Sequence, residues 1–195
     1  MVGVNMKIEG ISEVSNRIKE MKQSLRIERR KAIENSSVYL MNYIQDKKLS
    51  GQVLKRRTAR LADSIGYKVE EKGTSFIGRV GTPVVYSVIH ETGGTIRAKN
   101  AKYLTIPLSD AMTPAGVVRK PARQWADTFV RKIRNNLFIF SKESGSPVPI
   151  FLLKKSVNIP KRPYIKPALQ ETKDKIFEMI GEAVKISVKI ANGEK

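Results

Sequence analysis

The one histidine of this 195-residue chain, His90, is followed directly by Glu91. An imidazole oriented by a carboxylate can act as a general base, so the pair would suit a hydrolase. A histidine beside an apolar stretch more often packs at a helix end or at a contact between subunits. We therefore favour a packing role for His90 and keep hydrolysis as the minor alternative.

Other catalytic and metal-binding patterns are missing from the sequence. It has no cysteine, which excludes disulfides, thiolate nucleophiles and cysteine-based metal sites, and one histidine cannot form a two-histidine site. No serine stands in a Gly-x-Ser-x-Gly turn, and Gly93-Gly94 lacks the Gly-Lys-Ser/Thr ending of a phosphate-binding loop. The sequence predicts no catalytic residue, cofactor or metal, and hence a protein that is not an enzyme.

The charge balance is more informative. Thirty-seven Lys and Arg against eighteen Asp and Glu give a formal charge of +19, which favours nucleic acid, an anionic membrane surface or an acidic protein as partner. Three clusters are nearly free of acid and are candidate contacts with DNA or an acidic partner, although a solvated surface is the usual meaning of any single cluster. They are Lys55, Arg56, Arg57 and Arg60; Arg119, Lys120 and Arg123, continued by Arg131, Lys132 and Arg134; and Lys154, Lys155, Lys161, Arg162 and Lys166. Few rings lie near them, so base stacking on single strands is not indicated.

Long helices are expected at both ends of the chain. Ile11, Val14, Ile18, Met21 and Leu25 recur at steps of three and four, which predicts an amphipathic helix over 12–47 with Ser12 as its N-cap and an optional break at 28–30. Apolar spacing over 164–191 predicts a second one. The first helix is longer than a small core can cover, so we expect part of it to contact a neighbouring subunit.

Short strands and turns are expected between these helices. After an extended start at 4–9, the patterns predict a loop at 49–54, a short helix at 58–64 capped by Thr58, and a hairpin over 67–80. A helix is expected at 84–91, stopped by Gly93-Gly94, then a strand pair at 95–99 and 103–108. A helix at 122–133, a hairpin over 137–153 and an irregular stretch at 158–163 complete the prediction. The fold class is α+β: two long helices packed on a central antiparallel sheet, as a single domain over 1–195 with an insertion at about 109–158.

No apolar run is long enough to span a bilayer, and Met1–Ile8 lacks the apolar core of a signal peptide. We expect a soluble protein that acts in the cell that makes it.

Several short blocks resemble neck and tail-completion proteins of long-tailed bacteriophages, including their virion-morphogenesis branch. The blocks are Leu49-Ser50-Gly51-x-x-Leu54-x-x-Arg57-Thr58-x-x-Leu61-x-x-Ser64-Ile65, Val80-Gly81-Thr82-x-Val84-x-Tyr86, Ile89-His90-Glu91-x-Gly93-Gly94-x-Ile96, Leu104-Thr105-Ile106-Pro107 and Ile159-Pro160-x-Arg162-Pro163-Tyr164-x-x-Pro167-Ala168-Leu169. They run in the same order from Leu49 to the C-terminus. Ala59 departs from the pattern, which has Gly there, and Thr92 stands where an aromatic residue is common.

The resemblance implies a structural virion protein at the neck or tail top, assembled in the host cytoplasm. It implies a ring of copies, with six as one case, between head-completion or connector proteins and tail-terminator or tail-tube proteins, beside DNA and away from membranes. It assigns 49–61 as an assembly loop, and Tyr86, His90, Glu91, Gly93, Gly94, Pro163 and Tyr164 as turn and packing residues. We expect the loop at 51–60 to be mobile in the isolated chain and ordered after assembly. A free, non-enzymatic nucleic-acid-binding protein is the alternative.

Overall fold

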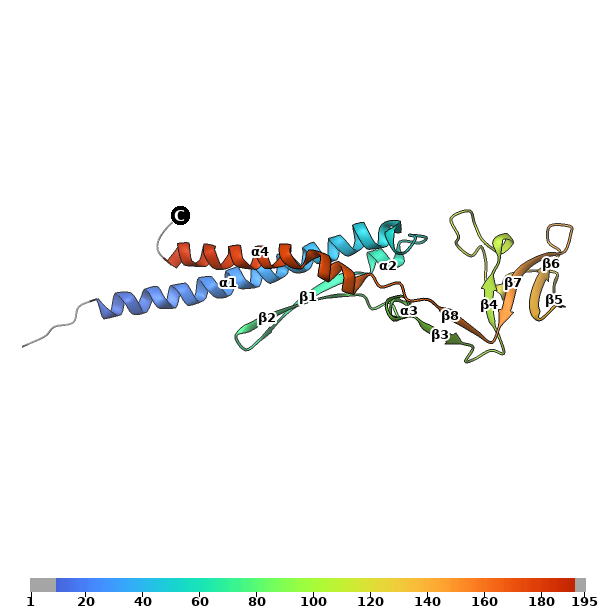
Figure 1. Ribbon diagram of the computed structural model, residues 1–195, viewed down its shortest axis with the longest axis horizontal. Helices are drawn as coiled ribbons and strands as arrows, with labels where there is room; N and C mark the ends of the chain where they lie inside the picture. Colours follow the sequence, from blue (N-terminus) through green and yellow to red (C-terminus); the bar gives the residue numbers. More distant parts are fainter. Residues whose placement is uncertain (1–9, 192–195) are drawn as a thin grey trace, which may run out of the picture. The chain divides into compact units, whose positions relative to one another are not determined.

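The computed structural model describes residues 10–191, and the extended start expected at 4–9 lies outside them. The α+β class is confirmed, with long helices at both ends and antiparallel strands between them (Figure 1). The chain forms two compact units. Unit 1 comprises residues 1–47, 65–83 and 165–195, and unit 2 comprises 48–64 and 84–164. The single domain expected over 1–195 stays a prediction.

The N-terminal helix α1 spans Ile11–Tyr43 and runs on into a π-helical segment η1, Ile44–Gln52. It has no break at 28–30. Ser12 is not the N-cap, because Gly10 takes that position with φ 88° and its carbonyl accepts a hydrogen bond from Val14 N at 3.1 Å. The expected loop at 49–54 begins late, since helical structure persists until Gly51, whose φ of 126° breaks it.

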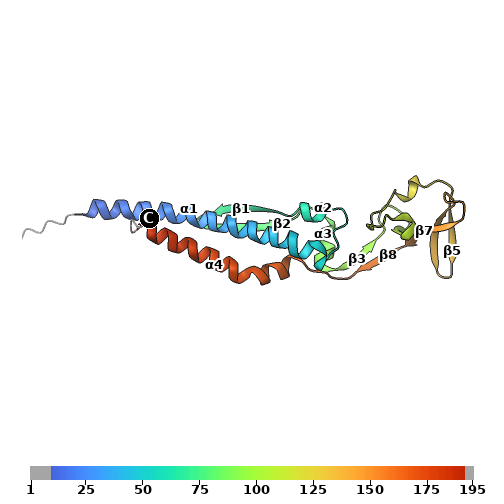
Figure 2. The same ribbon diagram turned by 90° about the horizontal axis from the view of Figure 1, so that it is seen from above.

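Unit 1 joins α1 to the C-terminal helix α4, Ile165–Ala191, and to a hairpin. Figures 1 and 2 both show α4 and the hairpin alongside α1. Small side chains line the buried helix faces, which lets the two backbones approach closely. The buried residues are Ala32, Ser36, Ser37 and Leu40 on α1, and Ala168, Thr172, Ala183 and Ser187 on α4.

The hairpin of unit 1 pairs β1, Gly66–Lys72, with β2, Ser75–Gly81, and confirms the strand pair expected there. It packs tightly on α1, because a Cβ at Gly78 would clash with the Ser37 hydroxyl. That hydroxyl donates a 2.7 Å hydrogen bond to the Ile33 carbonyl of its own helix. Gly78 is therefore a site of close approach rather than a flexible point in the strand.

Two short helices open unit 2. Helix α2 spans Arg60–Asp63, and Thr58 does not cap it: Ala59 stands at the N-cap with a left-handed φ of 59°. Helix α3, Tyr86–Thr92, ends at Gly93, as the Gly93-Gly94 pair predicted.

The predicted pairing of strands 95–99 and 103–108 with each other is wrong. Strand β3, Gly94–Arg97, pairs with β8, Ser156–Ile159, whose last two residues fall in the stretch expected to be irregular. Strand β4, Leu104–Pro107, pairs instead with β7, Val148–Lys154. The reason is burial: every residue of β3 is exposed, so only the apolar β7 offers β4 a surface on which to cover its own apolar side chains.

A four-stranded antiparallel sheet in the order β4-β7-β6-β5 completes unit 2. The hairpin of β6, Asn136–Ser141, with β7 was expected. The helix expected at 122–133 is wrong, because only Ala122–Gln124 form a 3₁₀ turn and Thr128–Ile133 form strand β5. The spacing of four between Phe129 and Ile133 is also compatible with a strand, and Phe129 stacks on Phe140 of β6 at 5.4 Å.

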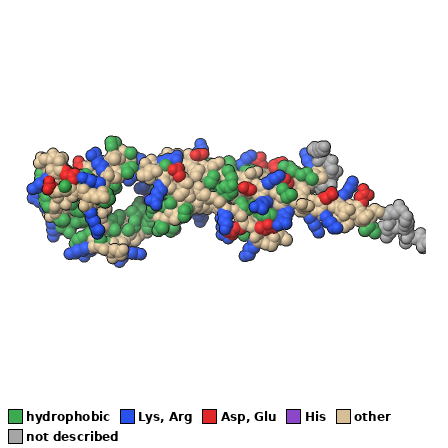
Figure 3. Space-filling view, turned by 180° about the vertical axis from the view of Figure 1, so that it is seen from behind, with side chains coloured by type: hydrophobic (Ala, Val, Ile, Leu, Met, Phe, Trp, Pro, Cys, Tyr) green, Lys and Arg blue, Asp and Glu red, His purple; other side chains and the backbone are tan. Residues whose placement is uncertain are grey.

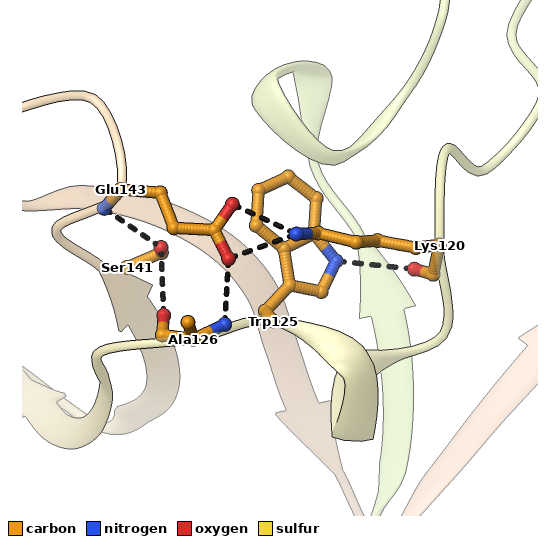
Figure 4. A network of polar contacts seen from close by, with 5 residues as sticks. All are labelled: Lys120, Trp125, Ala126, Ser141 and Glu143. Atoms are coloured by element: carbon orange, nitrogen blue, oxygen red, sulfur yellow. Dashed lines mark hydrogen bonds and ion pairs between the residues drawn. The ribbon is translucent and has the colours of Figure 1, made fainter.

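The core of this sheet consists of Ala111, Ile150 and Phe151, with Trp125 packed against it. Figure 4 shows how polar contacts fix the Trp125 corner. The indole donates to the Lys120 carbonyl at 3.1 Å, and the Lys120 ammonium lies 4.5 Å from the ring centre. Glu143 accepts from this ammonium at 2.8 Å and from Ala126 N at 2.6 Å, and these bonds, that of Lys120 first, lower the pKa of Glu143.

Candidate functional site

Unit 2 contains a groove of about 830 Å³, here called the cationic groove. Three separate parts of the sequence form it: the stretch 49–62 from the end of η1 through α2, one face of α3, and the loop at 116–118, with Arg162 added from the segment before α4. It is lined by Leu49, Gly51, Val53, Leu54, Lys55, Arg56, Arg57, Thr58, Ala59, Leu61, Ala62, Tyr86, His90, Gly116, Val117, Val118 and Arg162.

Local backbone structure explains why the first wall, residues 49–62, is held in place. Leu49 and Ala62 are each only 3% exposed and anchor its two ends. The Lys48 carbonyl accepts hydrogen bonds from Val53 N and Leu54 N, which turns the chain after η1. The left-handed Ala59 then turns it into α2, a conformation that costs a residue with a Cβ about 1–2 kcal/mol. Glycine would avoid that cost, which gives a physical reason for the Gly of the resembling pattern.

The four cations of the groove differ in how they are paired. Arg57 Nη1 donates to the Gly116 carbonyl at 3.2 Å and so ties the first wall to the 116–118 loop. Arg56 forms an ion pair with Asp63 at 2.9 Å. Lys55 and Arg162 have no ion-pair partner among residues 10–191, and no carboxylate lines the groove. The groove therefore carries a positive charge that the described part of the chain does not compensate.

His90 faces this groove from the end of α3. Burial, and secondarily the neighbouring Arg162 charge, lowers the pKa of His90 below its usual value of 6.5, so the ring is neutral near pH 7. Its Nδ1 is buried without a hydrogen-bond partner among the described residues, so no carboxylate orients the imidazole through that nitrogen. Tyr86 meets the ring edge to face at 6.2 Å. This geometry fits the packing role and gives no support to a base held by Glu91 through Nδ1.

Of the residues assigned to turn and packing roles, Tyr86 and His90 line the groove, and the others do not. Glu91 Oε2 accepts from the backbone N of Tyr164 at 2.8 Å, and the His90 carbonyl accepts from Arg162 N at 2.8 Å. Together these bonds fasten the segment before α4 to α3. Tyr164 is fully buried, and burial raises the pKa of its phenol.

Gly93 and Gly94 permit that attachment. A Cβ on Gly93, whose φ is 71°, would lie 2.9 Å from Lys161 N, so only glycine lets the two backbones meet. Gly94, with φ 146°, leads directly into β3. Pro163 follows Arg162 and precedes α4.

The three basic clusters of the sequence do not form a single surface. Lys55, Arg56, Arg57 and Arg162 meet in the groove. The others do not line it. Arg60 lies on α2, Lys161 lies against Gly93, and Arg123 and Lys155 are exposed. Three more are engaged elsewhere: Arg119 donates to the Met112 carbonyl, Lys120 pairs with Glu143, and Lys154 donates to Asn136. Arg131 and Lys132 lie on β5, and Arg134 follows it at the turn, so none of the three extends a helix as predicted. Figure 3 shows Lys and Arg spread over one face of both units, with Asp and Glu among them.

The sequence missed one wall of the groove. The sequence patterns did not single out residues 116–118, although Val117-Val118 form an apolar pair there. Met112 and Val118 form an isolated bridge, and Thr113 N donates to the Val117 carbonyl at 2.8 Å. An apolar pair in an otherwise turn-rich loop was the available signal.

The excess charge belongs mainly to unit 2. Its residues include 19 Lys and Arg but five Asp and Glu, whereas unit 1 has 18 and 13, so the formal charges are +14 and +5. Among residues 10–191, no group of three acidic or histidine side chains could hold a metal ion. Within the same range, no helix combines the length and the apolar composition needed to cross a membrane. Comparisons with family models, with curated proteins and with solved structures found no match.

Proposed function

We propose that this chain is a structural, non-catalytic protein of a long-tailed bacteriophage particle, which completes the tail and joins it to the DNA-filled head. One observation carries the proposal. Blocks of sequence that resemble neck and tail-completion proteins are far apart in the chain, yet residues of four of them, within 49–61, at Tyr86, at His90 and Glu91, and at Arg162 and Tyr164, line or support one cationic groove. A shared docking surface explains why such dispersed residues would follow a common pattern.

A second observation supports assembly from several copies. Helix α4 exposes an apolar stripe of Leu169, Phe177, Val184 and Val188, whose side chains are 43–59% exposed, on top of the face it buries against α1. The first turns of α1 likewise expose Ile11, Val14 and Ile18, by 64%, 58% and 43%. Exposed apolar helix faces of this extent are typical of contacts between proteins. The proposed ring, with six copies as one case, would bury them.

The positive charge of every copy opposes the formation of such a ring unless a negatively charged partner compensates it. Each copy brings a formal charge of +19, most of it on unit 2, and like charges repel at short range. The proposed ring is therefore stabilised by DNA in its channel or by acidic faces of adjoining connector, terminator or tube proteins.

Deletion of the gene from the phage genome tests this function. We expect DNA-filled heads and unattached tails to accumulate, and joined particles to return when the gene is supplied in trans. A Gly93→Ala version is a useful supplied variant, because it should disturb the groove and restore fewer joined particles. Normal joined particles in the deletion strain would rule the proposal out.

A free nucleic-acid-binding protein is the second candidate, because a formal charge of +14 on one unit also suits phosphates. It predicts tight binding of duplex DNA by the purified chain, with a steep dependence on salt. Binding would be lost when Arg56, Arg57 and Arg60 are changed to Ala. Weak binding that is indifferent to these changes would exclude this candidate.

A further inference from the structure

We infer that the cationic groove binds an extended acidic segment of a partner protein, with apolar side chains of that segment inserted between its walls. The inference deepens the proposed function and rests on it for the source of the segment, which would be an adjoining protein of the particle. The net charge alone is compatible with DNA or with an acidic protein as partner, and the inference favours the acidic protein.

The first step is that the occupant is anionic. Four cations and no carboxylate line the groove, and Lys55 and Arg162 have no ion-pair partner within residues 10–191. Burial, and secondarily the Arg162 charge, lowers the pKa of His90, so a further positive group is disfavoured at this position of the groove. An anion that enters between these side chains gains charge-assisted hydrogen bonds without displacing an existing carboxylate from Lys55 or Arg162.

The second step is that the occupant is also apolar. The aliphatic side chains of Leu49, Val53, Leu54, Leu61, Val117 and Val118 line the same groove as the cations. Val118 is 41% exposed at the rim. A nucleic-acid backbone presents phosphates and sugars but no group that would dehydrate such walls, whereas a polypeptide can offer Asp or Glu together with Leu, Ile or Phe. Two rings, Tyr86 and His90, line the groove, and they pack edge to face on each other, so they form no row on which successive bases could stack.

The third step is that the occupant is an extended segment rather than a folded surface. The groove is concave, and its volume of about 830 Å³ lies in the range of sites that enclose a ligand. One wall, the 116–118 loop, is joined to the other by the Arg57 to Gly116 hydrogen bond, so the groove lies between two chain segments. An extended segment with a few side chains can enter such a groove, whereas a flat protein face cannot.

Selection from a random peptide library, displayed and panned on the purified full-length chain, tests the inference. We expect enriched peptides to combine Asp or Glu with large apolar residues. Synthetic labelled copies of these peptides, and a labelled DNA duplex of mixed sequence, would then be measured by fluorescence anisotropy at physiological salt.

Matched variants locate the binding. The double change Lys55→Glu and Arg162→Glu reverses the two unpaired charges, and Arg131→Glu with Lys132→Glu makes the same charge change on strand β5, away from the groove. Val118→Asn removes apolar surface without changing charge. We expect the groove pair to weaken peptide binding by at least about tenfold, Val118→Asn to weaken it by several-fold, and the β5 pair to leave it nearly unchanged.

Several results would overturn the inference: no enriched peptide, equal binding by the groove pair and the β5 pair, no effect of Val118→Asn, or competition by the duplex for the same site. Circular dichroism of each variant shows whether it is folded, and Lys55→Gln with Arg162→Gln provides a milder version. Because binding is measured on the purified chain, its loss is separate from a failure of the virion role, which the gene deletion reports.

Discussion

The two units of this chain differ in the net charge and the apolar character of their surfaces. Unit 1 has a formal charge of +5, against +14 for unit 2, and pairs several of its charges, as in Arg26–Glu71 at 2.8 Å and Lys185–Glu182 at 2.7 Å, yet it leaves apolar side chains exposed along α1 and α4. Unit 2 leaves most of its positive charge unbalanced and shapes part of it into a groove. A small net charge with exposed apolar surface suits contact between identical copies, whereas a large positive charge suits contact with a negatively charged partner. On the basis of this comparison, we propose that unit 1 contacts other copies of the chain and that unit 2 binds a different partner.

The largest expected effect concerns the support of the groove. Gly93→Ala should lower the free energy of unfolding of unit 2 by about 2–4 kcal/mol, because the new Cβ adds a clash with Lys161 N to left-handed strain. Urea denaturation followed by Trp125 fluorescence measures it, since the single tryptophan lies in unit 2.

Gly145→Ala is the control for that change. Gly145 has a similar φ of 88° but open space around its Cα, so its change should cost only the strain, about 1–2 kcal/mol. Equal losses for the two variants would mean that the close approach of Lys161 does not hold the segment in place.

The apolar stripe of unit 1 gives the next effect. Phe177→Glu together with Val184→Glu should weaken self-association by roughly a hundredfold while leaving the fold intact, because both side chains are exposed within one copy. Sedimentation equilibrium measures it. Gln170→Glu adds negative charge at an exposed position of the same helix and should have little effect. If the double variant associates like the unchanged chain, the stripe is not the contact between copies.

A smaller and opposite effect is expected in the first wall of the groove. Ala59→Gly should raise the free energy of unfolding of unit 2 by about 0.5–1 kcal/mol, because relief of the left-handed strain exceeds the added flexibility of the unfolded chain. Chemical denaturation monitored through Trp125 reports the change. A loss of stability would show that residue 59 is not strained.

The smallest effect is the pH dependence of unit 2. The pKa of His90 is lower in the folded chain than its unfolded value of about 6.5, so the unfolded chain binds the proton more readily. Stability should therefore fall as the pH is lowered from about 7.5 through 6.5 to the folded pKa, and level off for this group below that. Urea midpoints of the unchanged chain and of His90→Gln should differ in this window, with the smaller fall in the variant. Parallel pH profiles would contradict the assignment.

Much of the fold could be predicted from the sequence where one local signal dominated. The spacing of Ile11, Val14 and Ile18 predicted α1, and the period of two after Gly66 predicted the first hairpin. The errors came where pairing between distant segments decides the outcome. Nothing local shows that β3 pairs with β8, or that Phe129 stacks on Phe140 in a strand.

The candidate site could be predicted only in part. The sequence identified the basic residues of the first wall, together with Tyr86 and His90, but it assigned them to separate roles. Their meeting in one groove depends on tertiary contacts such as Arg57 to Gly116 and Arg162 N to the His90 carbonyl. The sequence contains the positions of all the charged residues. Their unequal division between two units can be recognised only when the residues of each unit are known from the structure.

Cross-linking of a mixed oligomer tests most directly the proposal that unit 1 contacts other copies and unit 2 binds a different partner. Light and heavy isotope-labelled copies of the full chain would be mixed, allowed to associate, and cross-linked through their lysines, so that mass spectrometry identifies links between copies. We predict that these links join lysines of unit 1, such as Lys22, Lys175 and Lys185, and that an acidic peptide bound in the groove leaves them unchanged. Links between copies that fall mainly on Lys55, Lys155 and Lys161 of unit 2 would contradict the account.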